Sequence, residues 1–565
     1  MENKTGQQSH TFHLGIAMAG AVSAGAYTAG VLDYLFETLE RWEKEKGKAD
    51  VPSHQVVIDV MGGASAGGMC AALAPLGRLG AAGENSTSLL KNLWVNITGA
   101  DKDIFDELLK TDDIKENETA VSFLNSNCID QIGESITKQL LALHASGNIP
   151  ELPGYFNQQL QVLLTLFNVS GLKFKMEINS IYRSEKKAQY AFEHRDMAHF
   201  KWDDTYTNDG LIPLWERENN KRTKEHIYTY VQAAKATGAF PIGLSPRKVK
   251  RRIQHIRDNE FIAGGVGDNL VFDSGPEQKH YESLNADGGT ANNEPLELIQ
   301  KIIKKTLECD TDFLPANCGV ILVDPFPAFD TKIESQTDHD KGLRKFAMKL
   351  LGAMRSQLLF DAKNMVASYK KKDLNSFMIA PAKTGSPPDK ALACGGLGGF
   401  SGFINKHYRE HDYHLGRRNC QQFLRYYFVV KPGETTHDAV IKSYTPEAIK
   451  RFAVINETEQ NGIKTRKVYL PIVPDTLNSN NSATNKIEPK YMDGNMTDVL
   501  PDKKVLFAYK KKVRQRLRYV LRHLFHVSLI GKVVFFPLFE VAVWLLPGVV
   551  LNYIYKDLKE RGVAK

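Results

Sequence analysis

The stretch MGGASAGGMCAAL, Met61–Leu73, follows the apolar, β-branched run VVIDV and is soon followed by a proline. Such an apolar run predicts a buried strand, and the small residues after it allow a sharp turn into a helix. A serine at the tip of such a turn presents its hydroxyl, an arrangement called a nucleophile elbow. Ser65 is therefore a candidate nucleophile, although an ordinary glycine-rich turn from strand to helix has the same pattern.

The pattern around this turn predicts an α/β protein. From Phe12 to about Val430, short apolar runs alternate with helical stretches. FHLGIAM at 12–18 and CGVILVDPFP at 318–327 are typical of buried strands, and VLDYLFETLERW at 31–42 has the apolar spacing of a helix. These elements favour a sheet between helices.

Composition shifts divide the chain into four parts. We predict a catalytic domain over 12–430, with a helical insertion at about 100–170 that covers a site. A C-terminal extension follows at 431–475, and then an Asn-rich linker at 476–500. Residues 501–565 differ in character from everything before them.

The totals of the 565-residue chain are those of an ordinary globular protein, with 42% hydrophobic and 24% charged residues. Its six cysteines are scattered without a CxxC pair, and the N-terminus lacks the basic and apolar regions of a signal peptide. We therefore expect free thiols and a cytoplasmic protein.

The formal charge of +8 belongs to one segment. Nine basic and no acidic side chains lie between Lys503 and His526, so the rest of the chain sums to −1. This segment has the spacing of an amphipathic basic helix. Nucleic-acid binding is not expected, because the apolar run beside the segment would have no role in it. The apolar positions of the helix are Leu506, Val513, Leu517, Val520, Leu521 and Leu524.

The apolar run Val533–Tyr555 is long enough to cross a bilayer, but it contains Pro537, Glu540 and Pro547. A carboxylate at the centre of a spanning helix costs roughly 2.5–3.5 kcal/mol. We therefore predict a hairpin or an in-plane anchor, with 503–555 bound to an anionic membrane surface. The alternative is a helix pair packed on the body or on a second copy, giving a homo-oligomer.

Two further segments have the residues that a serine nucleophile needs. GAVSAGAYTAGVL at 20–32 is a second turn of small residues, whose uncovered amides could stabilise an oxyanion. Small residues there could equally serve tight packing of the helix. ADGGTANNEPLELI at 286–299 places Asp287 rigidly before two glycines, where a shielded carboxylate would have a raised pKa and could act as a base.

Four motifs in this order, GAVSAGAYTAGVL, GASAG, KATGAFPIGLSPR and ADGGTANNEP, resemble those of the patatin-like phospholipase family. The resemblance implies a three-layer sandwich around a mostly parallel sheet, without a cofactor. It implies that Ser65 is the nucleophile and Asp287 the base of a dyad that needs no histidine. It also implies that the amides of Gly20, Ala21 and Val22 form the oxyanion hole.

One departure from the family concerns this loop. The usual G-G-G-x-R-G is replaced by G-A-V-S-A-G, in which Ala24 takes the place of the arginine. A β-branched Val22 disfavours positive φ, so we expect a different loop geometry and weakened activity. The rival reading is a catalytically silent lipid-binding or scaffold protein anchored by its C-terminus.

The segment 392–424 combines glycines, histidines and arginines. We expect Asp412 and Arg417 to brace the site, or Arg417 and Arg418 to bind an anionic headgroup; a helix-capping ion-pair cluster is the alternative. No metal is expected, because the spacing of the metal-ligating residue types matches no common closed zinc site. Those residues are His407, His411, His414 and Cys420.

Taken together, these features predict a phospholipase A-type hydrolase of fatty-acyl esters, peripheral or C-terminally anchored at the membrane. A hydrolase of soluble esters, whose C-terminus serves only self-association, is a further alternative.

Overall fold

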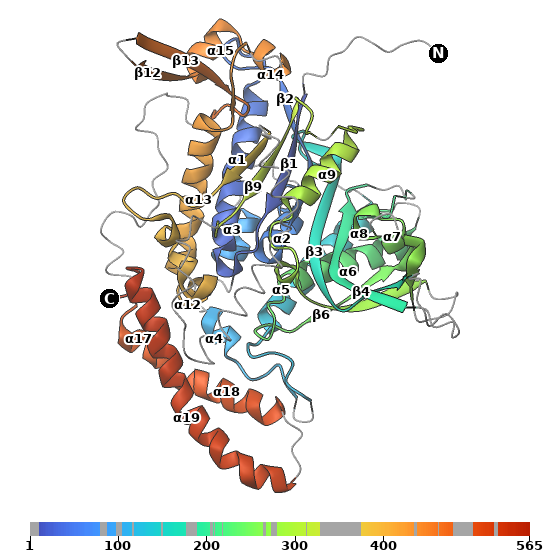
Figure 1. The fold of residues 1–565 in the computed structure, drawn as a ribbon, viewed down its shortest axis with the longest axis vertical. Helices are drawn as coiled ribbons and strands as arrows, with labels where there is room; N and C mark the ends of the chain where they lie inside the picture. Colours follow the sequence, from blue (N-terminus) through green and yellow to red (C-terminus); the bar gives the residue numbers. More distant parts are fainter. Residues whose placement is uncertain are drawn as a thin grey trace, which may run out of the picture.

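A computed structural model describes most of the chain (Figure 1). The described residues are 11–79, 88–97, 104–115, 118–147, 151–176, 189–203, 207, 209–216, 219–263, 267–272, 279–311, 313–327, 375–433, 438–460, 463–477, 501–524 and 529–565.

A mixed, mostly parallel sheet forms the centre of the molecule, in the strand order β10-β9-β1-β2-β3-β4-β5. Strands β10, β9, β1, β2 and β3 run parallel, whereas β4, β7 and β8 pair antiparallel with β3, and β6 pairs with β8. The apolar runs predicted as strands become the buried β1, β2 and β9. The strands are β1 (Thr11–Met18), β2 (Gln55–Gly63), β3 (Phe156–Met176), β4 (Gln189–Lys201), β5 (Ile212–Pro213), β6 (Arg247–Arg252), β7 (Leu270–Val271), β8 (His280–Asp287), β9 (Cys318–Val323) and β10 (Ser376–Ile379).

Helices cover both faces of this sheet (Figure 1). The large core lies between one face and the helices α1 (Gly25–Glu45), α2 (Ser65–Leu73), α6 (Asn220–Thr237) and α13 (Lys406–Tyr426). A smaller core lies under α9 (Leu296–Thr306) on the opposite face. The predicted α/β fold with a central, mostly parallel sheet is confirmed. Short helices α7 (Ile253–Arg257) and α8 (Glu260–Ala263) lie beyond β6.

The expected helical insertion at about 100–170 is only partly present. α4 (Ile104–Leu108) and α5 (Asn127–Ser146) are helical and follow α3 (Leu89–Trp94), but the chain from Phe156 onward enters the sheet as β3. Both faces of this strand are covered, so its buried residues form a continuous run instead of an alternating pattern. A continuous apolar run also fits a buried helix, which explains the difference from the predicted helix. The run in β3 includes Leu160, Val162, Leu163, Leu164 and Leu166.

The extension at 431–475 packs against α1. It contains α14 (Asp438–Lys442), α15 (Pro446–Phe452) and a small antiparallel sheet. The Tyr34 hydroxyl donates a hydrogen bond to Asp475 (3.0 Å), and His54 contacts Ser443 (2.7 Å). Most of the predicted linker, 478–500, lies outside the described residues. The strands of the small sheet are β11 (Val429–Val430), β13 (Ile463–Pro471) and β12 (Val454–Gln460).

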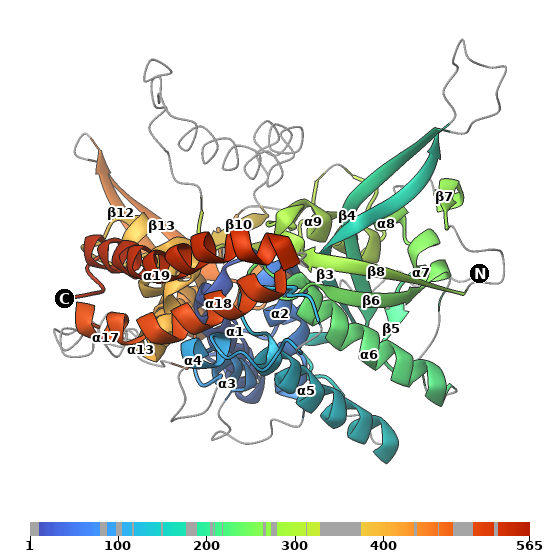
Figure 2. The ribbon, with the colours of Figure 1, turned by 90° about the horizontal axis from the view of Figure 1, so that it is seen from below.

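The C-terminal segment forms α17 (Lys503–Ala508), α18 (Lys510–Leu524) and α19 (Leu529–Glu560). α18 and α19 lie side by side in both views (Figures 1 and 2). The predicted hairpin within 533–555 is wrong, because the backbone of α19 continues through both prolines. Each proline removes one hydrogen bond and can bend a helix, but it does not force the chain to reverse. Among the described residues, no helix combines the length and apolar character that crossing a bilayer requires.

Candidate active site

Ser65 lies at the sharp turn between β2 and α2. Its φ is +52°, in the left-handed region that non-glycine residues rarely adopt. The backbone N–H of Ser65 donates to the Thr237 hydroxyl (3.0 Å), which holds the turn from the side of α6. A Cβ on Gly67 would lie 2.4 Å from the carbonyl oxygen of Met18, so this turn needs a glycine against β1. The predicted strand, turn and helix are thus present.

Asp287 is the last residue of β8, and the sheet brings it to Ser65. β8 pairs with β3 at Leu166, and β3 lies beside β2, the strand that ends at the Ser65 turn. The Ser65 hydroxyl donates to Asp287 Oδ2 at 2.6 Å, and both residues are buried. Asp287 Oδ1 accepts the Gly289 amide (2.7 Å), which orients the carboxylate toward the serine. The predicted pair therefore lies within bonding reach, in a geometry that allows the carboxylate to take the hydroxyl proton.

The loop at 20–24 faces this pair, and it corrects two expectations. Val22 adopts φ +49° despite its branched side chain, so the expected departure in geometry does not occur at this residue. The Gly20 amide donates to the Asn293 carbonyl (3.2 Å) and is therefore occupied, contrary to its predicted role as a donor. No described residue accepts a hydrogen bond from the amides of Ala21 or Val22. These two amides remain the candidate oxyanion donors.

Residues 393–404, which we call the bracing segment, hold this loop in place. The Ser23 hydroxyl donates to the Gly399 carbonyl and accepts the Gly402 amide (3.1 Å). Asp412 on α13 fixes the same segment, because its carboxylate accepts the backbone amides of Ala393 and Cys394, both at 2.8 Å. A strained φ persists only where surrounding contacts determine it. The expectation that Asp412 braces the site agrees with these contacts.

Arg417 pairs with α1 instead of facing open solvent. Its guanidinium makes two bonds to Glu37 (2.8 and 2.6 Å) and lies over the rings of Tyr34 and Tyr413. Arg418 is buried. These contacts indicate that Arg417 stabilises the packing of α13 against α1. None of them supports binding of a headgroup.

An apolar pocket surrounds the Ser65 hydroxyl. Phe400 and Phe403, from the bracing segment, form one wall, and Phe400 also packs edge-on against Phe240 (5.0 Å between ring centroids). Sequence reasoning missed this wall, since the segment was considered for its charged residues and not for FSGF. The other walls come from helices α2 to α5 and from the start of the loop after α6. The lining residues include Val22, Met69, Trp94, Ile97, Ile104, Leu108, Leu124, Cys128, Ile129 and Leu244.

Two carboxylic acids lie close to the loop at 20–24, the candidate oxyanion loop. Glu294 follows the residue whose carbonyl accepts the Gly20 amide, and burial together with the charge of Asp324 raises the pKa of Glu294 to about 7. Burial raises the pKa of Asp324 to about 6, against the opposing effect of the Phe326 amide. Both groups therefore gain a charge in the folded protein only as the pH approaches neutrality.

Replacing Glu294 with glutamine is expected to stabilise the protein at pH 8 and to have little effect at pH 5. The folded state binds the Glu294 proton more tightly than the unfolded state. The stability that this protonation contributes is therefore fully present below the ordinary pKa of 4.5 and is lost as the pH rises through about 7. Glutamine stays neutral and avoids this loss, about 1–3 kcal/mol. Urea unfolding at both pH values measures it, with Glu297→Gln as the control. An equal effect at both pH values would contradict the assignment.

Comparisons with known proteins agree with this geometry. A family model described as Patatin-like phospholipase matches residues 16–299, which include the oxyanion loop, Ser65 and Asp287. The uncharacterized protein y4iI of Sinorhizobium fredii is 29% identical over 524 residues, which cover 82% of this chain and 70% of that protein. The crystal structure of VipD from Legionella pneumophila aligns over 100% of this chain and 94% of that chain, at 10% identity. Its TM-score of 0.22 supports no statement about fold.

Proposed function

The chain belongs to the patatin-like phospholipase family, and from this premise we propose that it hydrolyses fatty-acyl esters of phospholipids with Ser65 and Asp287 as its catalytic pair. Membership of this family implies a lipid acyl hydrolase. The observation that carries the finer proposal is the 2.6 Å contact between the Ser65 hydroxyl and Asp287 at the floor of an apolar pocket.

In the first half of the proposed cycle, Asp287 takes the proton of Ser65 while Oγ attacks the ester carbonyl carbon. The carbonyl oxygen becomes an oxyanion, which the amides of Ala21 and Val22 would stabilise. When the carbon–oxygen bond to the alcohol breaks, Asp287 returns the proton to the departing lysolipid oxygen. The acyl group is left on Ser65 as an ester.

In the second half, a water molecule gives a proton to Asp287 and attacks the acyl-enzyme. The bond to Oγ breaks, the fatty acid leaves, and Ser65 recovers its proton from Asp287. Serine, aspartate and water are sufficient to balance both steps. The buried contact between Ser65 and Asp287 supports this scheme, because a base must lie within hydrogen-bond reach of the proton that it takes.

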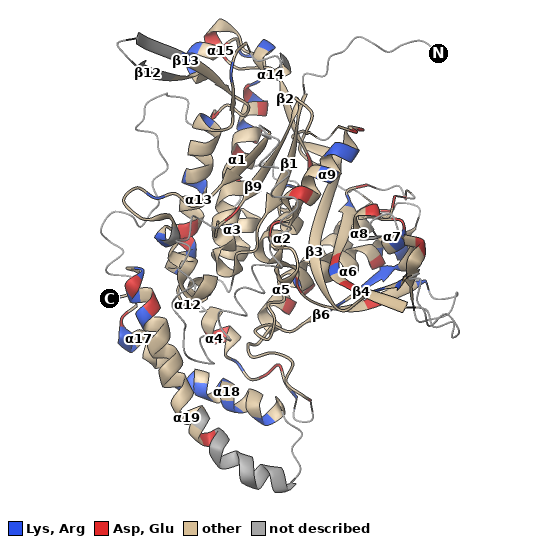
Figure 3. Ribbon diagram, viewed as in Figure 1, with Lys and Arg blue, Asp and Glu red and all other residues tan. Residues whose placement is uncertain are grey.

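The C-terminal helices support the further proposal that this hydrolase acts at an anionic membrane surface. α19 packs on α17, α18 and the segment Ala393–Gly399, and several apolar side chains in its described part are exposed. Lys504 and Lys511 are exposed on the neighbouring helices, where basic residues gather (Figure 3). A cationic and apolar surface of this kind suits anionic lipid. The exposed apolar residues are Val541, Trp544, Leu545, Leu546, Val549, Val550 and Tyr553.

Not all basic residues of this segment face solvent as the sequence predicted. Arg516 is buried and pairs with Asp113 through its two terminal guanidinium nitrogens. It also donates to the carbonyls of Lys110 and Phe123 (2.7 and 2.8 Å). A buried guanidinium requires such a partner for its charge. This arginine therefore anchors α18 to the stretch between α4 and α5, which supplies Leu124 to the lining of the Ser65 pocket.

Replacing both Leu545 and Val549 with glutamate is expected to lower fatty-acid release from anionic vesicles at least tenfold. Both side chains are at least half exposed, so the change places two charges on the lipid-facing surface without disturbing the core. Hydrolysis of a soluble short-chain ester should stay within twofold of the wild type. Vesicle sedimentation and activity on both substrates give the measurement, and unchanged vesicle binding would remove the membrane proposal. The matched control is Ile449→Glu with Ile455→Glu, two exposed positions distant from α19 in the sequence.

The direct test of the proposed function is reaction with a fluorophosphonate probe. The proposal predicts stoichiometric labelling, mapped to Ser65 by peptide mass spectrometry, and release of fatty acid from phospholipid vesicles by the unlabelled protein. Vesicle binding without labelling or release would instead favour the lipid-binding or scaffold alternative.

A further inference from the structure

The pocket at Ser65 adjoins a second apolar pocket. The two pockets share Met69, Trp94, Ile97 and Ile129, so the space between them is bounded by the same four side chains. We call the second one the inner pocket; beyond the shared residues it is lined by Ala72, Leu73, Leu76, Leu93, Ile132, Gly133, Ile136, Tyr230, Val231, Ala234 and Lys235.

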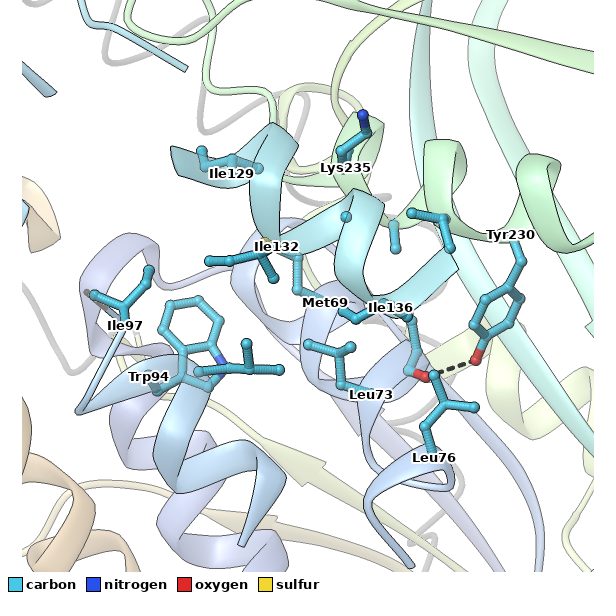
Figure 4. Close-up of a pocket in the computed structure, with 15 residues that line it drawn as sticks. Met69, Leu73, Leu76, Trp94, Ile97, Ile129, Ile132, Ile136, Tyr230 and Lys235 are labelled. Carbon is cyan, nitrogen blue, oxygen red and sulfur yellow. Dashed lines mark hydrogen bonds between the residues drawn. The ribbon is translucent and has the colours of Figure 1, made fainter. Parts of the chain in front are cut away.

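The inner pocket lies between helices α2, α3, α5 and α6, and Figure 4 shows how their side chains face one another. Ile132 and Ile136 on α5 face Leu73 on α2, and Tyr230 comes from α6 (Figure 4). Two polar groups of the lining are already occupied, and the indole N–H of Trp94 is buried without a hydrogen-bond partner among the described residues. The Tyr230 hydroxyl donates to the Ala72 carbonyl (2.6 Å), and the Lys235 ammonium pairs with Asp130 (2.9 Å).

A pocket of this kind offers a ligand almost only apolar contact. Apolar cavities with so few free polar partners do not hold ordered water and accept hydrocarbon. The direction of the pocket adds to this argument, because α2 carries Ser65 at its start and Leu73 at its end. A rise of 1.5 Å per residue places these two residues roughly 12 Å apart, which suits about ten methylene groups of an extended chain.

The passage between the pockets has one rigid and one adaptable wall. The indole of Trp94 lies against α1 so closely that a Cβ on Gly25 would come within 2.5 Å of the ring. Met69 lies one turn after Ser65 on α2, and its unbranched side chain can change rotamer to admit a chain. The passage therefore has a fixed side and a movable side.

We propose that the two pockets form one acyl-binding channel, passing between Met69 and Trp94, and that the inner pocket makes the enzyme selective for long-chain acyl esters. This inference rests on the proposed function, since the channel starts at the Ser65 hydroxyl. Short acyl groups would fill only the first pocket, and each methylene group that enters the inner pocket would add about 0.8 kcal/mol of apolar transfer free energy.

The test fills the inner pocket from α6. In Ala234→Phe a ring enters the inner pocket, whereas Gln232→Phe introduces the same ring on the same helix at a position outside both pockets and serves as the control. For each protein, kcat/KM is measured on p-nitrophenyl esters from butyrate to palmitate. For the wild type and the control, kcat/KM should increase with the length of the acyl chain. Relative to both of them, Ala234→Phe should lose at least tenfold more kcat/KM on laurate and palmitate than on butyrate.

The results separate failure of the channel from failure of the proposed function. A wild type that hydrolyses no ester and is not labelled at Ser65 overturns the proposed function. An active wild type whose chain-length profile is unchanged, or is lowered equally at every length, by Ala234→Phe overturns the channel. If Ala234→Phe does not fold, the channel is tested by labelling the wild type with alkyl fluorophosphonates. The channel predicts that the labelling rate increases from the butyl to the dodecyl probe. A flat series overturns the channel.

Discussion

The Ser65→Ala substitution is expected to reduce fatty-acid release by about 10⁴-fold or more. The change removes the only atom that can form the acyl-enzyme in the proposed cycle. Because the hydroxyl is buried and its single side-chain partner is Asp287 at 2.6 Å, the fold should tolerate the loss. Fatty-acid release from phospholipid vesicles measures the effect, and circular dichroism checks the fold.

Asp287→Asn should have a comparable effect, and the double variant should be little worse than either single one. Residues that act as a unit in one step are not additive, because the second loss removes a function already gone. The asparagine keeps the shape of the side chain and the acceptor for Gly289, so lost activity reports the lost base. Ser443→Ala, which removes a buried hydroxyl bonded to His54, is the control. Activity retained in either active-site variant would contradict the catalytic pair.

The second large effect is on stability. Gly416→Ala is expected to destabilise the protein by about 2–3 kcal/mol, because overpacking a close helix contact forces the backbones apart. α1 and α13 cross so closely that a Cβ on Gly416 would lie 2.2 Å from the Tyr27 carbonyl oxygen. From the other helix, a Cβ on Gly30 would lie 2.0 Å from the carbonyl of Tyr413. Activity should fall with stability, since α1 begins directly after the oxyanion loop.

The matched control is Gly154→Ala. An added Cβ there meets no atom within 4 Å, so the melting temperature and the urea midpoint should stay near those of the wild type. If Gly416→Ala unfolds at the same urea concentration as this control, the close contact between α1 and α13 is not what holds them together.

The sequence could predict the part of the site that depends on short-range signals. The turns at Ser65 and Asp287 are encoded by glycines beside the functional residues, so their local shape follows from the sequence. The proximity of Ser65 and Asp287 could be predicted only from the family motifs, because no periodicity in the sequence indicates that β8 pairs with β3. The pocket wall from Phe400 could not be predicted this way, since it comes from a segment hundreds of residues beyond the serine.

Two other errors have the same physical origin, which is that tertiary contacts outweigh local preference. Val22 disfavours positive φ on its own, but the bonds of its neighbour Ser23 to Gly399 and Gly402 hold the loop in that conformation. Arg516 has the spacing of a solvent-facing residue on a basic helix, yet Asp113 makes its burial favourable. Both contacts join segments that are far apart in the sequence.

The distance in sequence between the two proposed catalytic residues determines when during synthesis the site can form. Ser65 and Asp287 are separated by 222 positions, and the Gly399 that holds the oxyanion loop is 376 positions beyond Ser23. At ribosomal rates, the first interval alone takes roughly 10–45 seconds. A nascent chain therefore carries a serine without its base during this time, so on the proposed mechanism lipolysis begins only once translation is well advanced.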